Sequence, residues 1–300
     1  MDNELIKLDR QEAVTVVTLN RPEALNALST ELRNSISSTF DLLAKDAQTQ
    51  VIVLTGAGRA FSVGLDLKEL GGEIDTKEKA LTRDVELSIS EVGKPVIGAV
   101  NGFAITGGFE LALMCDFLIA TPSAKFADTH ARVGVVPGWG LSQKLPRLIG
   151  INRAKELSLT GNFLDAETAM KWGLVNRVVE EKALISVCVG LAQDIASTDP
   201  ATRSEIRKIM DSGWLSTLDD GLQWEKEANR NHSKKHKPER EVAAPVACAW
   251  SAESASASVT VCSHGCWLID MPLPLMPIDS REENRPSRKT VRAPLSFDSS

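Results

Sequence analysis

Short apolar runs and amphipathic stretches alternate along the first half of the chain. Two β-type runs open it, at residues 5–8 and 14–19, and the polar segment between them predicts a hairpin or sharp turn. Residues 51–54 and 96–100 are almost wholly apolar and rich in β-branched side chains, and a glycine-containing loop follows each run. Strands that are buried on both faces of a parallel sheet have this pattern. The first half of the chain therefore predicts a β/α core.

Helical periodicity occurs between and after these strands. Ser29 is a good N-cap for a helix with a single apolar stripe. We expect further helices at about residues 77–92 and 109–114, and a strand at residues 117–120. From residue 141 onward the pattern is helical throughout, which predicts a helical C-terminal region. The expected C-terminal helices cover residues 152–159, 165–172, 182–195, 200–210 and 218–231.

The character of the sequence changes near residue 240. The segment beyond it has no helical period and becomes rich in Pro, Ser and Arg. Sequence of this kind most often stays disordered, because it cannot bury enough apolar surface. We therefore expect an α/β core at residues 1–195, a helical region of the same domain at residues 196–239, and a disordered tail at residues 240–300.

The composition is that of a globular chain without a nucleic-acid or membrane partner. The 300 residues are 43% hydrophobic, and the formal net charge is −6, with basic residues scattered rather than gathered into a stripe. The longest uncharged stretch of the globular part, residues 95–109, is too short to span a bilayer. The N-terminus lacks the pattern of a secretory signal. These features predict a cytoplasmic protein.

Two glycine-bearing loops are the first candidates for chemistry. In GRAFSVGLDLKEL the backbone turns at Gly64, and a short helix is expected to begin near Leu65 or Asp66. In NGFAITGGFELAL, Gly107 and Gly108 open a second helix. Backbone N–H groups at a helix start are unpaired, so two such starts can converge on one oxygen and form an oxyanion hole. Glycine-rich turns after strands are, however, mostly structural.

Five segments of the chain form an ordered set. They are RPEALNAL, GRAFSVGLDLKEL, GKPVIGAVNGFAITGGFELALMCD, AKFADTHARVGVVPGWG and LTGNFLDAETAMKWGLVNRVV. In this order and spacing they resemble the enoyl-CoA hydratase/isomerase (crotonase) family across about residues 5–235. The resemblance implies the crotonase fold, a spiral of ββα units with a C-terminal helical trimerisation region. It also implies an acyl-CoA or enoyl-CoA substrate and a homotrimer or a dimer of trimers.

By position, the resemblance implies that the N–H groups of Leu65 and Gly107 form the oxyanion hole. Arg59 and Lys68 suit the anionic nucleotide of CoA, although both can equally be solvated surface charges. Ala24 lies where the family touches CoA, but its small side chain also suits close packing. The expected substrate and CoA contacts are Ala24, Arg59, Ser62, Val63, Leu65, Asp66, Leu67, Lys68 and Gly107.

The acid/base pair departs from the hydratase pattern. Hydration of a 2-enoyl thioester needs one group that takes a proton from water and another that protonates C2, and the family's hydratases use two glutamates. Glu110, three residues after Gly107, matches the first, with a structural ion pair as its alternative role. The second position, twenty residues later, holds His130. An imidazole with a pKa of about 6.5 is a competent acid or base, and Asp128 is a neighbouring carboxylate that can serve instead.

The missing glutamate leaves three functions open. The first, which we favour, is an enoyl-CoA hydratase-like enzyme that uses Glu110 with His130 or Asp128. The second is another reaction through the same enolate, such as isomerisation, decarboxylation or thioester hydrolysis. The third is a non-catalytic acyl-CoA-binding protein. Trp139 is expected to narrow the acyl pocket or simply to pack. We expect no metal, and no cofactor apart from the CoA that the substrate carries.

Overall fold

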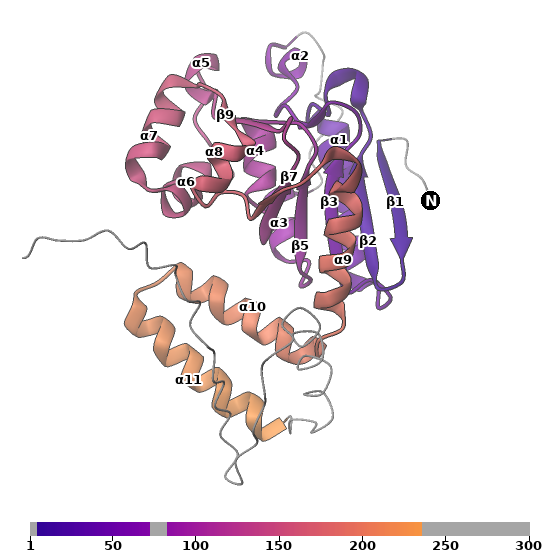
Figure 1. Ribbon diagram of the computed structural model, residues 1–300, viewed down its shortest axis with the longest axis vertical. Coiled ribbons are helices and arrows are strands. Elements are labelled where there is room, and N and C mark those ends of the chain that lie inside the picture. Colours follow the sequence, from indigo (N-terminus) through magenta and orange to yellow (C-terminus); the bar gives the residue numbers. More distant parts are fainter. Residues whose placement is uncertain (1–4, 73–82, 236–300) are drawn as a thin grey trace, which may run out of the picture. The chain divides into compact units, whose positions relative to one another are not determined.

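The computed structural model describes residues 5–72 and 83–235, and within them two β-sheets carry the fold (Figure 1). The larger sheet has the strand order β1-β2-β3-β5-β7-β10. Strands β1 and β2 form the predicted antiparallel hairpin, and the other neighbours in this sheet are parallel. The strands are β1 (Ile6–Gln11), β2 (Val14–Leu19), β3 (Val51–Gly56), β5 (Val96–Val100), β7 (Phe117–Ala120) and β10 (Arg177–Val178).

The central strands of this sheet are buried on both faces, which explains their continuous apolar sequence. In β3, Ile52 and Leu54 belong to the main hydrophobic cluster, whereas Val51 and Val53 pack with helix α9 (Leu184–Ala196) on the other face. This alternation is the two-residue period of a strand. Because both faces are covered, neither needs polar side chains, and the prediction of a parallel β/α core is confirmed.

A smaller sheet has the strand order β4-β6-β8-β9, and its first three strands continue the chain from strands of the larger sheet. Strand β4 comes directly after β3, β6 after β5 and β8 after β7, and a helix follows each pair, so the order strand, strand, helix occurs three times. Strands of two or three residues are too short to show a period, so the sequence pattern predicts none of these strands. The strands are β4 (Ala60–Ser62), β6 (Phe103–Ile105), β8 (Lys125–Ala127) and β9 (Leu164–Asp165).

The helices mostly agree with the predicted ones. Ser29 caps α1, because its side chain accepts a hydrogen bond from the Leu32 N–H at 3.2 Å. The first helices are η1 (Pro22–Ala24), α1 (Thr30–Lys45), α2 (Leu67–Leu70), α3 (Val85–Ser90), α4 (Gly107–Ala112) and α5 (His130–Val133). The later ones are α6 (Leu141–Ile149), α7 (Ile151–Thr160), α8 (Ala166–Lys171), η2 (Glu181–Ala183), α9, α10 (Pro200–Trp214) and α11 (Leu218–Lys235).

Two helix predictions are wrong in part. The helix expected at residues 77–92 begins at Val85, where the Asp84 side chain caps it, and ends at Ser90; residues 73–82 lie outside the described part. The C-terminal region is not helical throughout, because β9 and β10 interrupt it and pair with β8 and β7 at the edges of the two sheets. These short strands form because they pair with the edge of an existing sheet, and no local sequence pattern predicts that pairing.

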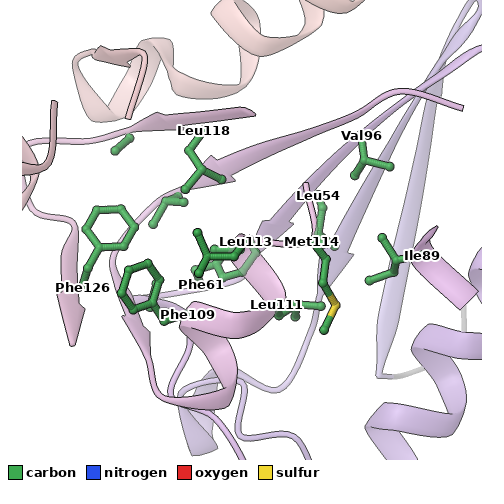
Figure 2. Packing of buried hydrophobic residues seen from close by; sticks show 14 of the residues in the cluster. Leu54, Phe61, Ile89, Val96, Phe109, Leu111, Leu113, Met114, Leu118 and Phe126 are labelled. Carbon is green, nitrogen blue, oxygen red and sulfur yellow. The ribbon is translucent and has the colours of Figure 1, made fainter. Parts of the chain in front are cut away.

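The main hydrophobic cluster joins the two sheets to helices α1 and α4. Figure 2 shows Phe109 of α4 beside Phe126 of β8, and their ring centroids lie 5.4 Å apart at an interplanar angle of 53°. Both side chains are fully buried, as is Phe61 of β4. Burial of an aromatic side chain stabilises a fold by about 2 kcal/mol or more. The packing of Phe109 therefore fixes the turn of α4 that carries the next residue, Glu110.

Two further predictions concern the C-terminal tail and the lack of a membrane-spanning segment. The unit to which the described residues belong ends at Lys235, and the disordered tail expected at residues 240–300 lies outside the described residues. Within the ranges that the structure describes, no helix is long and apolar enough to cross a membrane.

Candidate active site

The smaller sheet brings three loops together at the carboxyl ends of its parallel strands. Ser62 of β4 pairs with Ala104 of β6, and Phe103 of β6 pairs with Lys125 of β8, so these strands end at the same edge. The loops that follow carry residues far apart in the sequence. They border one cavity of about 280 Å³, whose lining includes Leu65, Gly107, Glu110, His130 and Trp139.

Leu65 contributes a backbone N–H to this cavity. The Leu28 N–H donates to the Gly64 carbonyl at 2.7 Å, and the Asp66 N–H donates to the Leu28 carbonyl at 3.5 Å, in an isolated parallel bridge between Leu28 and Leu65. Because peptide groups alternate in direction along an extended chain, the Leu65 N–H points away from Leu28. Helix α2 has Asp66 as its N-cap and Leu67 as its first residue, close to the expected start, but the Leu65 N–H lies before the helix. The bridge, and not a helix start, orients this donor.

Gly107 contributes a second N–H, as the first residue of α4. The first helical bond of α4 runs from the Glu110 N–H to the Thr106 carbonyl at 2.9 Å, so the Gly107 N–H has no acceptor within its helix. A Cβ atom on Gly107 would lie 3.5 Å from Leu65 N, and one on Gly64 would lie 2.9 Å from Gly107 N. The two donors therefore lie beside each other, where a side chain would crowd them.

The residue before Gly107 has an unusual backbone conformation. Thr106 has φ 54° and ψ −116°, a region that a β-branched residue rarely adopts. Its N–H donates to the Ala127 carbonyl at 2.8 Å, and its hydroxyl is hydrogen-bonded to the Thr129 hydroxyl. These contacts hold the turn that presents the Gly107 N–H, and they join it to the loop that carries His130.

Glu110 is a buried carboxylate held from two sides. It is 3% exposed, and its Oε1 accepts a hydrogen bond from the Trp139 backbone N–H at 2.8 Å. Its Oε2 lies 3.5 Å from His130 Nε2, which is longer than a direct hydrogen bond but short enough for an ion pair. A carboxylate this deeply buried needs a compensating charge, and the imidazole of His130 is positioned to supply it.

His130 stands between two carboxylates. Its Nδ1 lies 2.6 Å from Asp128 Oδ1, and the same oxygen accepts the His130 backbone N–H at 3.2 Å. Burial alone would lower the pKa of the imidazole, but the interactions with Asp128 and Glu110 outweigh it and raise the pKa to about 9. Burial likewise opposes the charge of Asp128, but the hydrogen bond with His130 lowers the pKa of that carboxyl. At neutral pH the imidazole of His130 is therefore protonated.

The remaining predicted contacts are divided. Val63 and Leu67 line the same cavity, whereas the other five predicted contacts do not, namely Ala24, Arg59, Ser62, Asp66 and Lys68. Arg59 is exposed and borders a separate cavity of about 720 Å³. Ser62 is fully buried, and its hydroxyl donates to the Asn26 carbonyl at 2.8 Å.

Asp66 lies 2.6 Å from Arg21, and its side chain caps α2. Burial opposes the charge of Asp66, yet the hydrogen bond from Arg21 lowers the pKa of its carboxyl. Lys68 is exposed on α2, and Ala24 ends the short helix η1.

Two features of the cavity are not evident in the sequence. The Trp139 backbone N–H anchors Glu110, but a backbone donor has no signature in side-chain patterns. Arg33 of α1 lines the cavity, although its position on the helix looks like an ordinary polar one. A weak signal for Arg33 exists, because it directly follows the buried Leu32 and so lies near the edge of the apolar stripe.

Comparison with known proteins agrees with this fold. The family model for enoyl-CoA hydratase/isomerase matches residues 9–244. The chain is 40% identical over 228 residues to the probable enoyl-CoA hydratase 1, peroxisomal, of Arabidopsis thaliana, covering 76% of this chain and 86% of that one. It is 35% identical over 233 residues to the short-chain-enoyl-CoA hydratase of Clostridium acetobutylicum, covering 76% and 89%.

Solved structures give the same result. The crystal structure of enoyl-CoA hydratase from Bacillus anthracis superposes with a TM-score of 0.71 at 37% identity, covering 75% of this chain and 90% of that one. A monofunctional enoyl-CoA isomerase from M. smegmatis superposes with a TM-score of 0.64 at 34% identity, covering 74% and 99%. The chain has an α/β fold of the crotonase class and belongs to the enoyl-CoA hydratase/isomerase family.

Proposed function

We propose that this chain hydrates 2-enoyl-CoA thioesters. The observation that carries the proposal is the pairing of Glu110 and His130, whose Oε2 and Nε2 atoms lie 3.5 Å apart in the cavity that Leu65 and Gly107 border. The names of its relatives, which include several enoyl-CoA hydratases, support the same reaction. The base is a carboxylate and the acid is an imidazolium, so the two come from different residue types.

The thioester oxygen accepts hydrogen bonds from the N–H groups of Leu65 and Gly107. Both donors are fixed by the backbone and lie beside each other, so they need no rearrangement when charge develops on that oxygen. As water attacks C3, the electron pair of the C2=C3 bond moves toward the thioester and forms an enolate. Preorganised donors at the developing oxyanion are worth about 10²–10³ in rate each.

Glu110 acts as the base and His130 as the acid. Glu110 takes a proton from the attacking water while the water oxygen bonds to C3. The Nε2–H of His130 then protonates C2, and the enolate collapses to the 3-hydroxyacyl thioester. The assignment follows from charge, because His130 with a pKa of about 9 carries a proton to give at neutral pH.

The two side chains also restore each other's protonation state after each turnover. After one turnover Glu110 holds a proton and His130 has lost one. When the product leaves, the proton passes from Glu110 to Nε2 as the two side chains close from their 3.5 Å separation to hydrogen-bond distance. The Trp139 N–H keeps Glu110 Oε1 in place, so Oε2 is the oxygen that exchanges the proton.

We keep the remaining expected contacts as part of this proposal. Arg59 and Lys68, both exposed, are assigned to the nucleotide of CoA, and Ala24, Ser62 and Asp66 to the walls and loops around it. The reaction as proposed uses no metal and no cofactor apart from the CoA of the substrate, and the cytoplasmic location expected from the sequence stays a prediction.

Isomerisation of the double bond is the second candidate. It needs only one base that moves a proton from one carbon of the acyl chain to another, and Glu110 alone can do this beside the oxyanion donors. The specific observation in its favour is the likeness to the monofunctional isomerase structure, with a TM-score of 0.64.

We also propose that residues 196–239 mediate assembly into a homotrimer or a dimer of trimers, within a spiral of ββα units. Among the described residues of α10 and α11, Ala228 alone is buried. Met210 of α10, Leu218 of α11 and Leu215, which directly follows α10, are 68%, 76% and 81% exposed. Apolar surface of this extent on two adjacent helices favours burial against another subunit.

The experiment that tests the function is a panel of 2-enoyl-CoA and 3-enoyl-CoA thioesters, with products read by mass. Hydration adds the mass of one water, isomerisation leaves the mass unchanged but moves the double bond, and hydrolysis releases free CoA. We expect the water adduct, and we expect its formation to require Glu110, with Glu156→Gln as a control at an exposed glutamate of α7. Binding of acyl-CoA without any Glu110-dependent product would contradict an enzymatic role.

A further inference from the structure

The cavity contains one charged side chain that the proposed hydration does not use. Arg33 of α1 lines it together with Leu67 and Leu70 of α2 and with Glu110 and His130. Its side chain is 17% exposed, so most of the side chain is removed from water. A largely buried cation needs an anion as its partner.

The described residues satisfy Arg33 only in part. Its Nη2 donates to the Thr30 hydroxyl at 3.0 Å. The nearest carboxylate oxygen, Glu69 Oε2, lies 3.9 Å away and already accepts hydrogen bonds from the Thr30 N–H and hydroxyl at 2.7 and 2.9 Å. Glu69 therefore caps the first turn of α1, and its distance from Arg33, although short enough for an ion pair, exceeds that of a hydrogen-bonded carboxylate and guanidinium.

The Nε–H of Arg33 has no acceptor at all within residues 5–72 and 83–235. A buried donor without an acceptor is uncommon, because it forfeits its hydrogen bond to water. Of the buried side-chain nitrogen and oxygen atoms in the described part, Arg33 Nε alone lacks a partner. A planar guanidinium whose hydrogen bonds to the protein are incomplete is suited to a carboxylate, which it binds through charge-assisted hydrogen bonds.

We propose that Arg33 binds a carboxylate at the far end of the acyl group, so that the preferred substrates are 2-enoyl-CoA thioesters with an ω-carboxylate. This inference rests on the proposed function, since it takes the cavity to hold the acyl chain. The apolar side chains of Leu67 and Leu70 lie along the same cavity and suit the methylene groups between the enoyl carbons and that carboxylate.

The phosphates of CoA are the other anionic groups of such a substrate. They are separated from the thioester by the whole pantetheine arm. A cavity of about 280 Å³ that contains Glu110 and His130 at the reacting carbons is too small to contain the nucleotide as well. Arg33 shares that cavity with the reacting groups, which favours the acyl carboxylate.

The test compares wild type and Arg33→Met on matched pairs of thioesters. Each pair has the same number of acyl carbons, one member ending in a methyl group and the other in a carboxylate, as in pent-2-enoyl-CoA and 4-carboxybut-2-enoyl-CoA. The series is extended by one methylene at a time. We expect wild type to hydrate at least one carboxylated member with a kcat/KM about ten- to a hundredfold above its neutral partner, the range of a charge-assisted hydrogen bond.

Arg33→Met is expected to abolish this preference, because kcat/KM should fall about ten- to a hundredfold more for the carboxylated thioesters than for their neutral partners. Arg10→Met is the control, because Arg10 of β1 is paired with Asp46, away from the cavity residues. The product mass should show water added and the carboxylate retained, since an arginine that neutralises the carboxylate disfavours loss of carbon dioxide.

Three results would overturn the proposal. The first is a wild type that hydrates neutral thioesters but shows no preference for any carboxylated one, a comparison that needs no variant to fold. The second is a preference that survives Arg33→Met. The third is an equal loss on neutral and carboxylated members, which would assign Arg33 to the CoA phosphates. If wild type hydrates no member of the series, the proposed function itself fails, and that result is separate from these three.

Discussion

The Nδ1 atom of His130 lies 2.6 Å from Asp128 Oδ1, and this contact turns the opposite ring nitrogen toward Glu110. Asp128 therefore has two effects on the imidazole. It fixes the ring orientation, and it stabilises the positive charge that makes His130 an acid. In the proposed reaction, protonated His130, hydrogen-bonded to Asp128, takes the place of the second glutamate that the family resemblance implies.

Replacing Asp128 by asparagine should change the pH dependence of hydration. The Asp128→Asn change keeps the size of the side chain but removes its charge, so the pKa of His130 would fall from about 9 toward its usual 6.5. The falling limb of kcat against pH should move to lower pH, with about a tenfold loss at a given alkaline pH for each unit of displacement. A pH profile of crotonyl-CoA hydration measures this. The exposed Asp194→Asn is the control, and an unmoved limb would rule out the acid role of His130.

Stability should depend on pH through the same histidine. Its pKa in the folded protein, about 9, lies above the usual value of 6.5, so protonation favours the folded state. The contribution is complete below about pH 6.5 and is lost as the pH rises through about 9. Urea unfolding at several pH values should show this fall in the free energy of unfolding, and His130→Gln should flatten it. An identical slope in the variant would contradict the imidazolium.

Thr106 offers a test of backbone strain beside the oxyanion donor. At φ 54° and ψ −116°, a residue with a Cβ atom is strained by about 1–3 kcal/mol, whereas glycine is not. Thr106→Ala and Thr106→Gly both remove the hydrogen bond to Thr129, so their difference isolates the strain. The glycine variant should be the more stable by about 1 kcal/mol or more in urea unfolding. The opposite order would show an unstrained backbone.

Assembly should depend on the exposed apolar side chains of α10 and α11. Leu215 is 81% exposed, so a charge there costs little in an isolated subunit but would be buried in an interface. Leu215→Glu should reduce the molecular mass measured by light scattering from that of a trimer or hexamer to that of a monomer. Leu159→Glu on α7, at a residue that is 76% exposed, is the matched control. Equal masses for wild type and Leu215→Glu would exclude this surface as the interface.

Much of the fold and part of the site could be predicted from the sequence. The buried parallel strands gave continuous apolar runs, and the spacing from Gly107 to Glu110 placed a carboxylate one helical turn from a backbone donor. The strands of the smaller sheet could not be predicted, because two or three residues show no period and their pairing is tertiary. The role of Leu65 depends on a bridge to Leu28, a contact across 37 residues that no local pattern contains.

The electrostatics of the site also lay beyond the sequence. His130 could be matched to the position of the family's second glutamate. Its charge, however, depends on its distances to Asp128 and Glu110, which only the fold sets. Arg33 looks like any polar residue on a helix, and only its burial beside the cavity distinguishes it.

The central claim is that Glu110 and His130 work as one acid/base unit in hydration. The most direct measurement is kcat for crotonyl-CoA, followed by loss of the enoyl-thioester absorbance, in wild type, Glu110→Gln, His130→Gln and the double variant. Each single change should lower kcat by about 10²–10⁴, and the double variant should be little slower than either, because the groups act together. A single variant that keeps wild-type kcat would contradict the account.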